Sequence, residues 1–218
     1  MTGDKTRRQI ILADLNDFSK LSDQEQFRTI SHISQAIVAE CENGGWEQPH
    51  AMTCQKWIDH FISTGDGFYI LLNPSIGPTA IHGPAISLAI RSHVLGDRLL
   101  PGIKIAIHWG TTIEFTGIAG DTSFVGTGMN YCARLLRLCD SFTDELEAFY
   151  GTLDRRSLIV VSEELAVHQD WRFLEKLPGF KKAGPFEFQV KSRQVKSYVI
   201  LADPIHVQRT RSFNPDAR

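Results

Sequence analysis

The sequence predicts a layered protein of the α/β or α+β class, with one mainly antiparallel sheet and helices packed on it. Short apolar runs, such as Ile10–Ala13 and Ser157–Val161, have the length and branched side chains of buried strands. Longer stretches with apolar residues at helical spacing separate them, as in Phe27–Cys41. The hydrophobic share is 42% of 218 residues, so we expect one globular domain over residues 1–218, with a core of about 10–201.

Capping and turn signals delimit the elements of the first half of the chain. A helix should begin at the capping box Ser22-Asp23-Gln24-Glu25 and end at Gly44-Gly45. Two strands should flank Gly65-Asp66-Gly67, a hairpin signal with one acidic side chain at its tip. In chain order we expect a loosely ordered tail (1–8), a strand (10–13), a helix (22–43), a loop or short strand (46–53), a strand pair (57–72), an irregular segment (73–83) and a helix (85–95).

Strands and a glycine-rich loop dominate the second half. Ile103–Trp109 alternates with the period of two that is typical of a strand, and His108 within it is interpreted as a structural group. The glycines between 117 and 128 do not have the spacing of a dinucleotide-binding loop. In chain order we expect strands (103–109 and, more weakly, 112–117), a loop (117–128), a helix (130–138), an acidic and aromatic insertion (140–156), a strand (157–161), a short helix (162–165), a hairpin (186–190 with 196–201) and a flexible tail (203–218).

Composition argues against several classes of function. The formal net charge is -2, which does not indicate nucleic acid or an anionic membrane as a partner. No apolar run approaches the roughly 20 residues that cross a bilayer, and the polar N-terminus is not a signal peptide, so we expect a cytoplasmic protein. The cysteines lack metal-site spacing and are interpreted as buried free thiols: Cys41, Cys54, Cys132 and Cys139.

Two aspartates occupy positions where a carboxylate is costly. Asp14 ends the dry strand 10–13, and a carboxylate there must be hydrogen-bonded, paired with a cation or bound to a metal. Asp66 is at the tip of the expected hairpin. A turn-capping role for Asp14 is the alternative. If the two strands are neighbours, Asp14 and Asp66 can share divalent cations.

Three motifs, in this order and spacing, resemble the catalytic core of class III nucleotidyl cyclases. They are Asp-x-x-x-Phe-Ser at 14–19, Gly-Asp-Gly at 65–67, and Gly-x-x-x-Asn-x-x-x-Arg at Gly126, Asn130 and Arg134. The similarity runs from about Ile10 to Leu201 and is greatest to the bacterial pyrimidine (uridylate or cytidylate) cyclases of Pycsar antiphage defence. The resemblance implies an α+β fold with a ferredoxin-like β-α-β-β-α-β core.

The resemblance also implies roles for individual residues. Asp14, Asp66 and the backbone carbonyl of Leu15 would hold two Mn²⁺ or Mg²⁺ ions. Asn130 would orient the ribose and Arg134 would contact the α-phosphate, the alternative being a solvated helix surface. Lys191 and Arg193 are candidates for binding the triphosphate. In this family the metal site comes from one subunit and the Asn/Arg pair from the other, which implies a homodimer with active sites at its interface.

The positions that select a purine base in this family carry neither purine code here. They are Ile62, which cannot hydrogen-bond a base, and Ser123, which can. Four further residues would line the base pocket, with the ring of the first able to stack on a base: Phe18, Thr64, Val125 and Met129. We therefore expect a pyrimidine cyclase that converts UTP to cyclic UMP, ahead of CTP to cyclic CMP.

Other functions remain open at this point. One is an adenylate cyclase with an unusual pocket, and another is a catalytically silent cyclase-like domain that binds nucleotide for regulation. The Gly-Gly-Asp/Glu-Glu-Phe turn of diguanylate cyclases is absent. If the resemblance to the defence cyclases holds, a separate effector that senses cyclic nucleotides would read the product.

Overall fold

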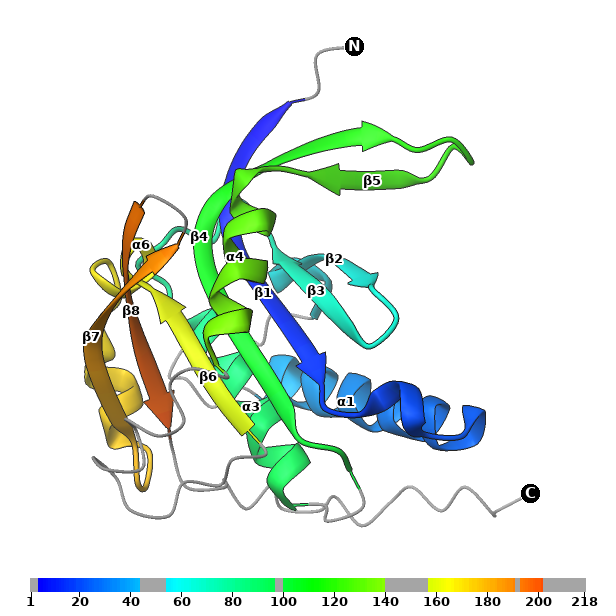
Figure 1. Ribbon diagram of the computed structural model, residues 1–218, viewed down its shortest axis with the longest axis horizontal. Coiled ribbons are helices and arrows are strands. Elements are labelled where there is room, and N and C mark those ends of the chain that lie inside the picture. Colours follow the sequence, from blue (N-terminus) through cyan, green and yellow to red (C-terminus); the bar gives the residue numbers. More distant parts are fainter. Residues whose placement is uncertain (1–3, 44–53, 97–99, 140–156, 191–192, 202–218) are drawn as a thin grey trace.

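The computed structural model describes residues 4–43, 54–96, 100–139, 157–190 and 193–201. Within these ranges the chain forms an eight-stranded mixed sheet with helices on both faces (Figure 1). The strands are β1 (Lys5–Leu15), β2 (Ile58–Ser63), β3 (Gly67–Leu72), β4 (Ile103–Thr116), β5 (Thr122–Val125), β6 (Ser157–Ser162), β7 (Lys181–Val190) and β8 (Arg193–Leu201). The helices are α1 (Asp23–Asn43), α2 (Cys54–Trp57), α3 (His82–Gly96), α4 (Thr127–Leu138) and α6 (Glu163–Ala166), with 3₁₀ turns η1 (Phe18–Lys20) and η2 (Trp171–Lys176).

The strand order identifies the core topology. The sheet runs β2-β3-β1-β4-β6-β8-β7, and β5 pairs with β4 outside this path. The first four strands pair with one another in antiparallel fashion, and with α1 and α3 they make the β-α-β-β-α-β unit. Only the β4–β6 pair is parallel in the described sheet. The expected ferredoxin-like α+β fold with a mainly antiparallel sheet is therefore confirmed.

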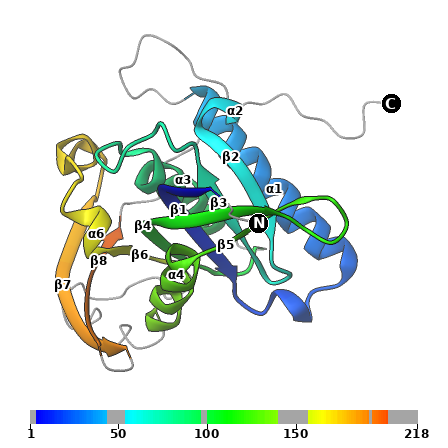
Figure 2. The same ribbon diagram turned by 90° about the horizontal axis from the view of Figure 1, so that it is seen from above.

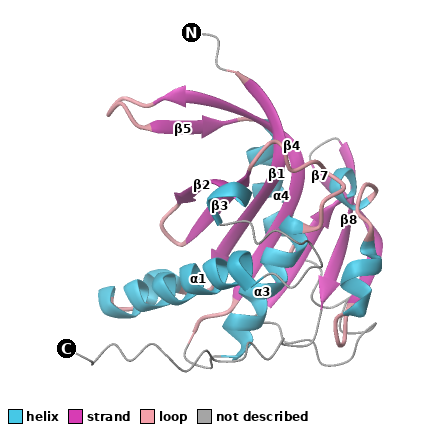
Figure 3. Ribbon diagram, turned by 180° about the vertical axis from the view of Figure 1, so that it is seen from behind, coloured by secondary structure: helices cyan, strands magenta, loops and turns pink. Residues whose placement is uncertain are grey.

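Strand β1 lies inside the sheet, between β3 and β4, and is buried on both faces. Ile11 and Ala13 pack on the side covered by α1 and α3, whereas Ile10 and Leu12 pack on the side covered by α4. Figures 1 and 3 show α4 on one face of the sheet and α1 and α3 on the other. A strand enclosed in this way needs apolar side chains at every position, which explains the continuous run from Ile10 to Ala13.

A long two-stranded arm, formed by the end of β4 and by β5, extends beyond the rest of the sheet (Figures 1 and 2). The expected separate strand at 112–117 is wrong, because β4 is continuous from Ile103 to Thr116. The expected loop at 117–128 contains β5, whose residues pair with Ile113–Thr116. A four-residue strand beside glycines lacks the length that would distinguish it from a loop by sequence.

The expected tail at residues 1–8 is also wrong in part. Residues Lys5–Arg8 extend β1 and pair with Gly110–Ile113 of β4, and Arg8 is only 3% exposed. Two boundaries also differ: Trp57 belongs to α2 rather than to a strand, and β7 begins at Lys181 rather than at Phe186. The expected loop at 46–53, the insertion at 140–156 and the tail at 203–218 lie outside the described residues.

Two of the four cysteines can be assigned. Cys132 and Cys139 are buried free thiols, as the sequence predicted. None of the helices within the described ranges has the length and apolar character that spanning a membrane requires.

Candidate active site

The two aspartates lie at the same end of neighbouring strands. Asp14 is opposite Gly67 in the β1–β3 pair, and the N–H of Leu15 donates a hydrogen bond to the carbonyl of Asp66 over 2.9 Å. In Figure 1 the end of β1 lies beside the turn that joins β2 to β3. The structure thus brings the backbone of Asp66 beside that of Asp14 and Leu15, which precede it by 52 and 51 positions in sequence.

Two glycines allow the β2–β3 turn to approach β1 this closely. Gly65 has φ +89°, a left-handed conformation that favours glycine. At Gly67 a Cβ would lie 2.1 Å from the carbonyl oxygen of Ala13, so no other residue fits without displacing a strand. The N–H of Thr64 closes the turn by donating to the carbonyl of Gly67 over 2.9 Å.

The ligand atoms at this strand end suit a hard divalent cation that is shared with a substrate. Asp14 is half-buried and Asp66 is exposed, and each offers carboxylate oxygens. The described residues contain no group of three or more His, Cys, Asp or Glu side chains that could hold a metal by themselves. Mg²⁺ is commonly bound by one or two carboxylates that act together with substrate phosphates and water. The donor set of Asp14, Asp66 and the Leu15 carbonyl fits that pattern.

The turn after β1 is partly used by the fold itself. The N–H of Asn16 donates to the carbonyl of Gly102 over 2.7 Å, so it is not available to a phosphate. Asp17 adopts a left-handed conformation with φ 57°. Phe18 is 7% exposed and belongs to the core under α1 and α3, which leaves its ring little surface for stacking on a base.

Helix α4 presents Asn130 and Arg134 outward. Gly128, Cys132 and Leu135 are buried toward the sheet, and the thiol of Cys132 donates to the carbonyl of Ala106 over 3.2 Å. Asn130 and Arg134 are exposed on the other side, one helical turn apart. Neither side chain makes a hydrogen bond or ion pair within the described part of the chain, so both are available to a ligand or partner.

The proposed base-contacting residues divide between two regions. Ile62 is opposite Tyr69 in the β2–β3 pair, and the Tyr69 hydroxyl donates to the carbonyl of Met129 over 3.5 Å. These three residues pack together on the α4 side of the sheet. The sequence motifs do not single out Tyr69. The signal that could have found it is its position on β3, two residues beyond Gly67.

The remaining expected pocket residues lie on the arm and at the turn. Ser123 is on β5, where its hydroxyl donates to a carboxylate oxygen of Asp121 over 3.0 Å. Val125, at the end of β5, is 50% exposed. Thr64 is exposed in the β2–β3 turn. These residues have surface available for a ligand, unlike Phe18.

The structure describes little of the two residues that were expected to bind the triphosphate. Lys191 lies outside the described residues, and Arg193 begins β8 with a side chain of which nothing is described. Lys196 on β8 pairs with Glu187 over 3.2 Å, and this hydrogen bond raises the pKa of the Lys196 ammonium group.

His108 lies beneath α4. Its Nδ1 is 2.9 Å from the Ser162 hydroxyl, and its ring stacks on Tyr131 at 4.4 Å between centroids. Burial, with a smaller contribution from the Arg7 charge, lowers the pKa of His108 to about 4. A neutral, hydrogen-bonded and stacked imidazole agrees with its interpretation as a structural group.

Comparison with known proteins identifies the fold. No family model matches the sequence, and no curated protein matches it. Among solved structures, the guanylate cyclase domain of RhGC from Catenaria anguillulae, in complex with GTP, matches with a TM-score of 0.61 and 13% identity over 92% of this chain and 99% of that one. A double mutant of the guanylyl cyclase domain of RhoGC from the aquatic fungus Blastocladiella emersonii matches with a TM-score of 0.58 and 13% identity, covering 93% and 98%.

An adenylyl cyclase has the same fold. CyaB from P. aeruginosa matches with a TM-score of 0.52 and 14% identity over 93% of this chain and 97% of that one. At these identities the likeness establishes the fold and not the activity. The chain therefore has the fold of class III nucleotidyl cyclase catalytic domains.

Proposed function

We propose that this protein is a nucleotidyl cyclase that converts a nucleoside triphosphate to a 3′,5′-cyclic nucleotide and diphosphate. The observation that carries the proposal is the pairing of β1 with β3, which puts Asp14 and Asp66 at one strand end within a class III cyclase fold. Two aspartates on neighbouring segments at the end of a buried strand offer the carboxylate ligands that a metal-dependent phosphoryl reaction needs.

The reaction needs the ribose 3′ hydroxyl to attack the α-phosphorus in line with the departing diphosphate. The bond from O3′ to the α-phosphorus forms, the bond from that phosphorus to the oxygen bridging to the β-phosphate breaks, and the O3′ proton is released to water. Asp14, Asp66 and the carbonyl of Leu15 would hold two Mg²⁺ or Mn²⁺ ions, which lower the pKa of the hydroxyl and neutralise phosphate charge when bound. Asn130 orients the ribose, and Arg134 stabilises the charge on the α-phosphate.

We propose that the active enzyme is a homodimer with an active site at each end of its interface. The metal ligands are at the end of β1, whereas Asn130 and Arg134 point away from the sheet on α4. The arm also exposes large apolar side chains, with Phe115 42%, Ile118 111% and Val125 50% exposed. A two-fold partner covering these surfaces would join the aspartates of one subunit to the helix α4 of the other.

Among the four common triphosphates we propose UTP as the preferred substrate, with CTP second. Ile62 is half-buried and cannot hydrogen-bond a purine edge, and the hydroxyl of Ser123 already donates to Asp121. The solved relatives are named for purine cyclisation, so an adenylate cyclase is the competing function. Neither position carries a purine-selecting side chain, which argues against an adenylate cyclase.

Product identification separates these functions. The purified protein is incubated with an equimolar mixture of ATP, GTP, CTP and UTP and with Mn²⁺, and cyclic products are measured by mass spectrometry. Cyclic UMP as the main product supports the proposal, and cyclic AMP as the main product contradicts the pyrimidine assignment. Absence of any cyclic product, with nucleotide binding retained, would favour a silent regulatory domain.

We further propose that the enzyme acts in the cytoplasm and that its product is a second messenger in antiphage defence, read by a separate cyclic-nucleotide-sensing effector. This part rests on the resemblance to the defence cyclases. Cells that carry the native gene neighbourhood should accumulate cyclic UMP after phage infection, and an Asp66→Ala variant should not. Unchanged cyclic UMP after infection by a panel of phages would contradict the defence role.

A further inference from the structure

A partly buried ion pair and an aromatic contact hold one histidine at the junction of β1, β2 and β5. Arg8 of β1, with a side chain 4% exposed, pairs through its guanidinium with the carboxylate of Asp59. The same carboxylate lies 3.5 Å from Nε2 of His60. The imidazole of His60 also packs on the ring of Phe124 at 4.4 Å between centroids. His60 is therefore contacted by two groups, the Asp59 carboxylate and the Phe124 ring.

The Arg8–Asp59 pair is more than a surface contact. The guanidinium carbon of Arg8 lies 5.5 Å from the centre of the Phe124 ring, so Phe124 is packed between Arg8 and His60. The Nε of Arg8 is buried without a hydrogen-bond partner among the described residues. Burying a charge in this way is costly unless it is paired, so Asp59 is held firmly and in turn orients His60.

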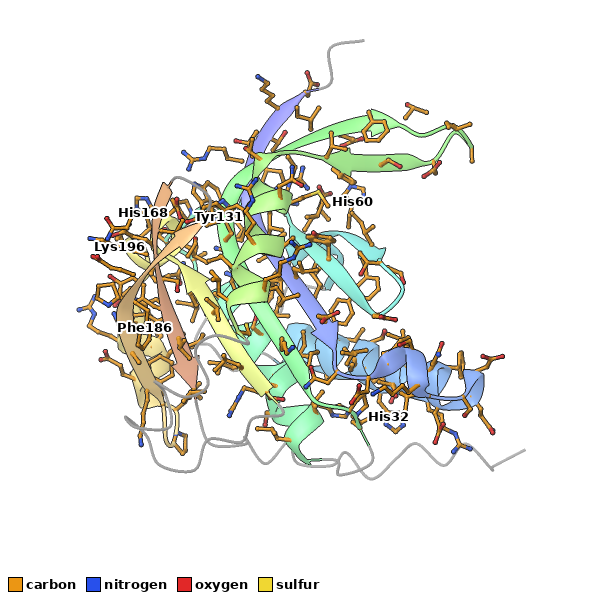
Figure 4. The ribbon with its side chains drawn as sticks, viewed as in Figure 1. His32, His60, Tyr131, His168, Phe186 and Lys196 are labelled. Carbon is orange, nitrogen blue, oxygen red and sulfur yellow. The ribbon has the colours of Figure 1, made fainter. Side chains whose placement is uncertain are left out.

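His60 lies between the two positions that were assigned to base selection. It precedes Ile62 by two residues on β2, so both side chains project from the α4 side of the sheet, about 6.6 Å apart along the strand. Phe124, which His60 contacts, is the neighbour of Ser123 on β5. Figure 4 shows His60 between the arm and the β2–β3 hairpin, beside α4. Its side chain keeps 30% of its surface exposed.

The carboxylate of Asp59 favours one of the two neutral tautomers of His60. In neutral imidazole one nitrogen donates and the other accepts. Because Asp59 lies beside Nε2, the tautomer with hydrogen on Nε2 is favoured, and Nδ1 is left as an acceptor. An acceptor nitrogen can receive a hydrogen bond from N3–H of uracil. N3 of cytosine carries a lone pair instead, which would repel the lone pair on Nδ1.

We propose that His60 is a specificity-determining residue that selects uracil over cytosine by accepting a hydrogen bond from N3–H of the base. Arg8 and Asp59 act through His60 as positioning residues. This inference rests on the proposed function, since it assigns His60 to the base region of the same site. It also supplies the polar group that Ile62 lacks.

The test compares nucleotide preference in binding and in turnover. Binding uses 3′-deoxy-UTP and 3′-deoxy-CTP, which lack the attacking hydroxyl, with Mn²⁺ and isothermal titration calorimetry. Turnover uses an equimolar mixture of UTP and CTP. The variants are His60→Ala and His60→Gln, the latter keeping a similar size while offering both a donor and an acceptor. His168→Ala, which changes an exposed histidine beyond α6, is the matched control.

Wild type and His168→Ala should prefer the uracil nucleotide, and both His60 variants should lose on the order of tenfold of that preference. A folded His60→Gln that keeps the wild-type ratio within twofold would overturn the inference, as would equal binding of the two analogues by wild type. If wild type forms no cyclic product from any triphosphate, the proposed function fails, but the binding ratios still decide the role of His60.

Discussion

Gly67 has no room for a side chain, because a Cβ there would lie 2.1 Å from the carbonyl oxygen of Ala13. Replacing it with alanine should separate β3 from β1 at the aspartates and cost about 1–3 kcal/mol of unfolding free energy. Gly77→Ala is the matched control, since nothing lies within 4 Å of a Cβ at that position. Urea unfolding of both variants measures the difference. Equal stabilities would show that the strand end is not tightly packed.

Asp14 and Asp66 should be needed for cyclase activity but not for folding. If they hold the ions, Asp14→Ala or Asp66→Ala should reduce cyclase turnover on the order of a thousandfold, since metal ions supply several kcal/mol to such transition states. The circular dichroism spectrum should remain that of wild type. Asp23→Ala, at an exposed carboxylate in the first turn of α1, should retain full activity. Full activity in either site variant would remove that residue from the metal site.

At the scale of elements, helix α4 is fixed to the sheet by close contacts along its length. A Cβ on Gly128 would lie 2.7 Å from Ile10 and 2.9 Å from Gly110, so the first turn lies directly against β1 and β4. Further along, Tyr131 stacks on His108 and Cys132 donates to the carbonyl of Ala106. These contacts set the rotation of the helix, and with it the outward direction of Asn130 and Arg134.

The stack beneath α4 should make stability depend on pH. Burial first and Arg7 second lower the pKa of His108 from 6.5 to about 4, although the partly exposed Glu164 lies 3.7 Å away. The unfolded chain therefore binds a proton before the folded one does, and stability should be lost as pH falls from about 6.5 to 4. For His108 alone the loss is at most about 3 kcal/mol.

His108→Phe keeps an aromatic ring under Tyr131 but cannot take up a proton. Urea unfolding at pH 7.5 and pH 4.5 should show a smaller loss of stability in this variant than in wild type. Tyr131→Phe, which keeps the stack and the histidine, should retain the wild-type dependence. Identical pH dependence in wild type and His108→Phe would mean that His108 is not the group responsible.

At the scale of the whole molecule, the division of the site between β1 and α4 leads to a complementation experiment. If each active site combines the aspartates of one subunit with α4 of the other, a dimer of Asp66→Ala with Arg134→Ala contains one intact site. Each variant alone should be inactive. Random exchange makes about half of the dimers mixed, and half of their sites intact, so the mixture should regain roughly a quarter of wild-type activity. No recovery, with subunit exchange demonstrated, would contradict the shared site.

The sequence by itself determined the class of fold and the candidate metal ligands. Strand and helix periodicity, the capping box at Ser22 and the Gly-Asp-Gly turn are local signals, and each names residues that lie within a few positions of one another. The hydrogen bonds in which Ser22 and Glu25 cap α1 reciprocally follow from such a signal. The β-α-β-β-α-β topology, in contrast, came from resemblance rather than from periodicity.

Only the tertiary structure decided which distant residues meet. Arg8 was expected in a flexible tail, yet pairing of β1 with β4 buries it against Asp59, 51 positions away, and brings His60 to Phe124. Phe18 fits the motif of a binding loop, but its ring fills the core. Strand pairing and burial depend on contacts between segments far apart in the chain, and no local pattern of residues encodes which segments those are.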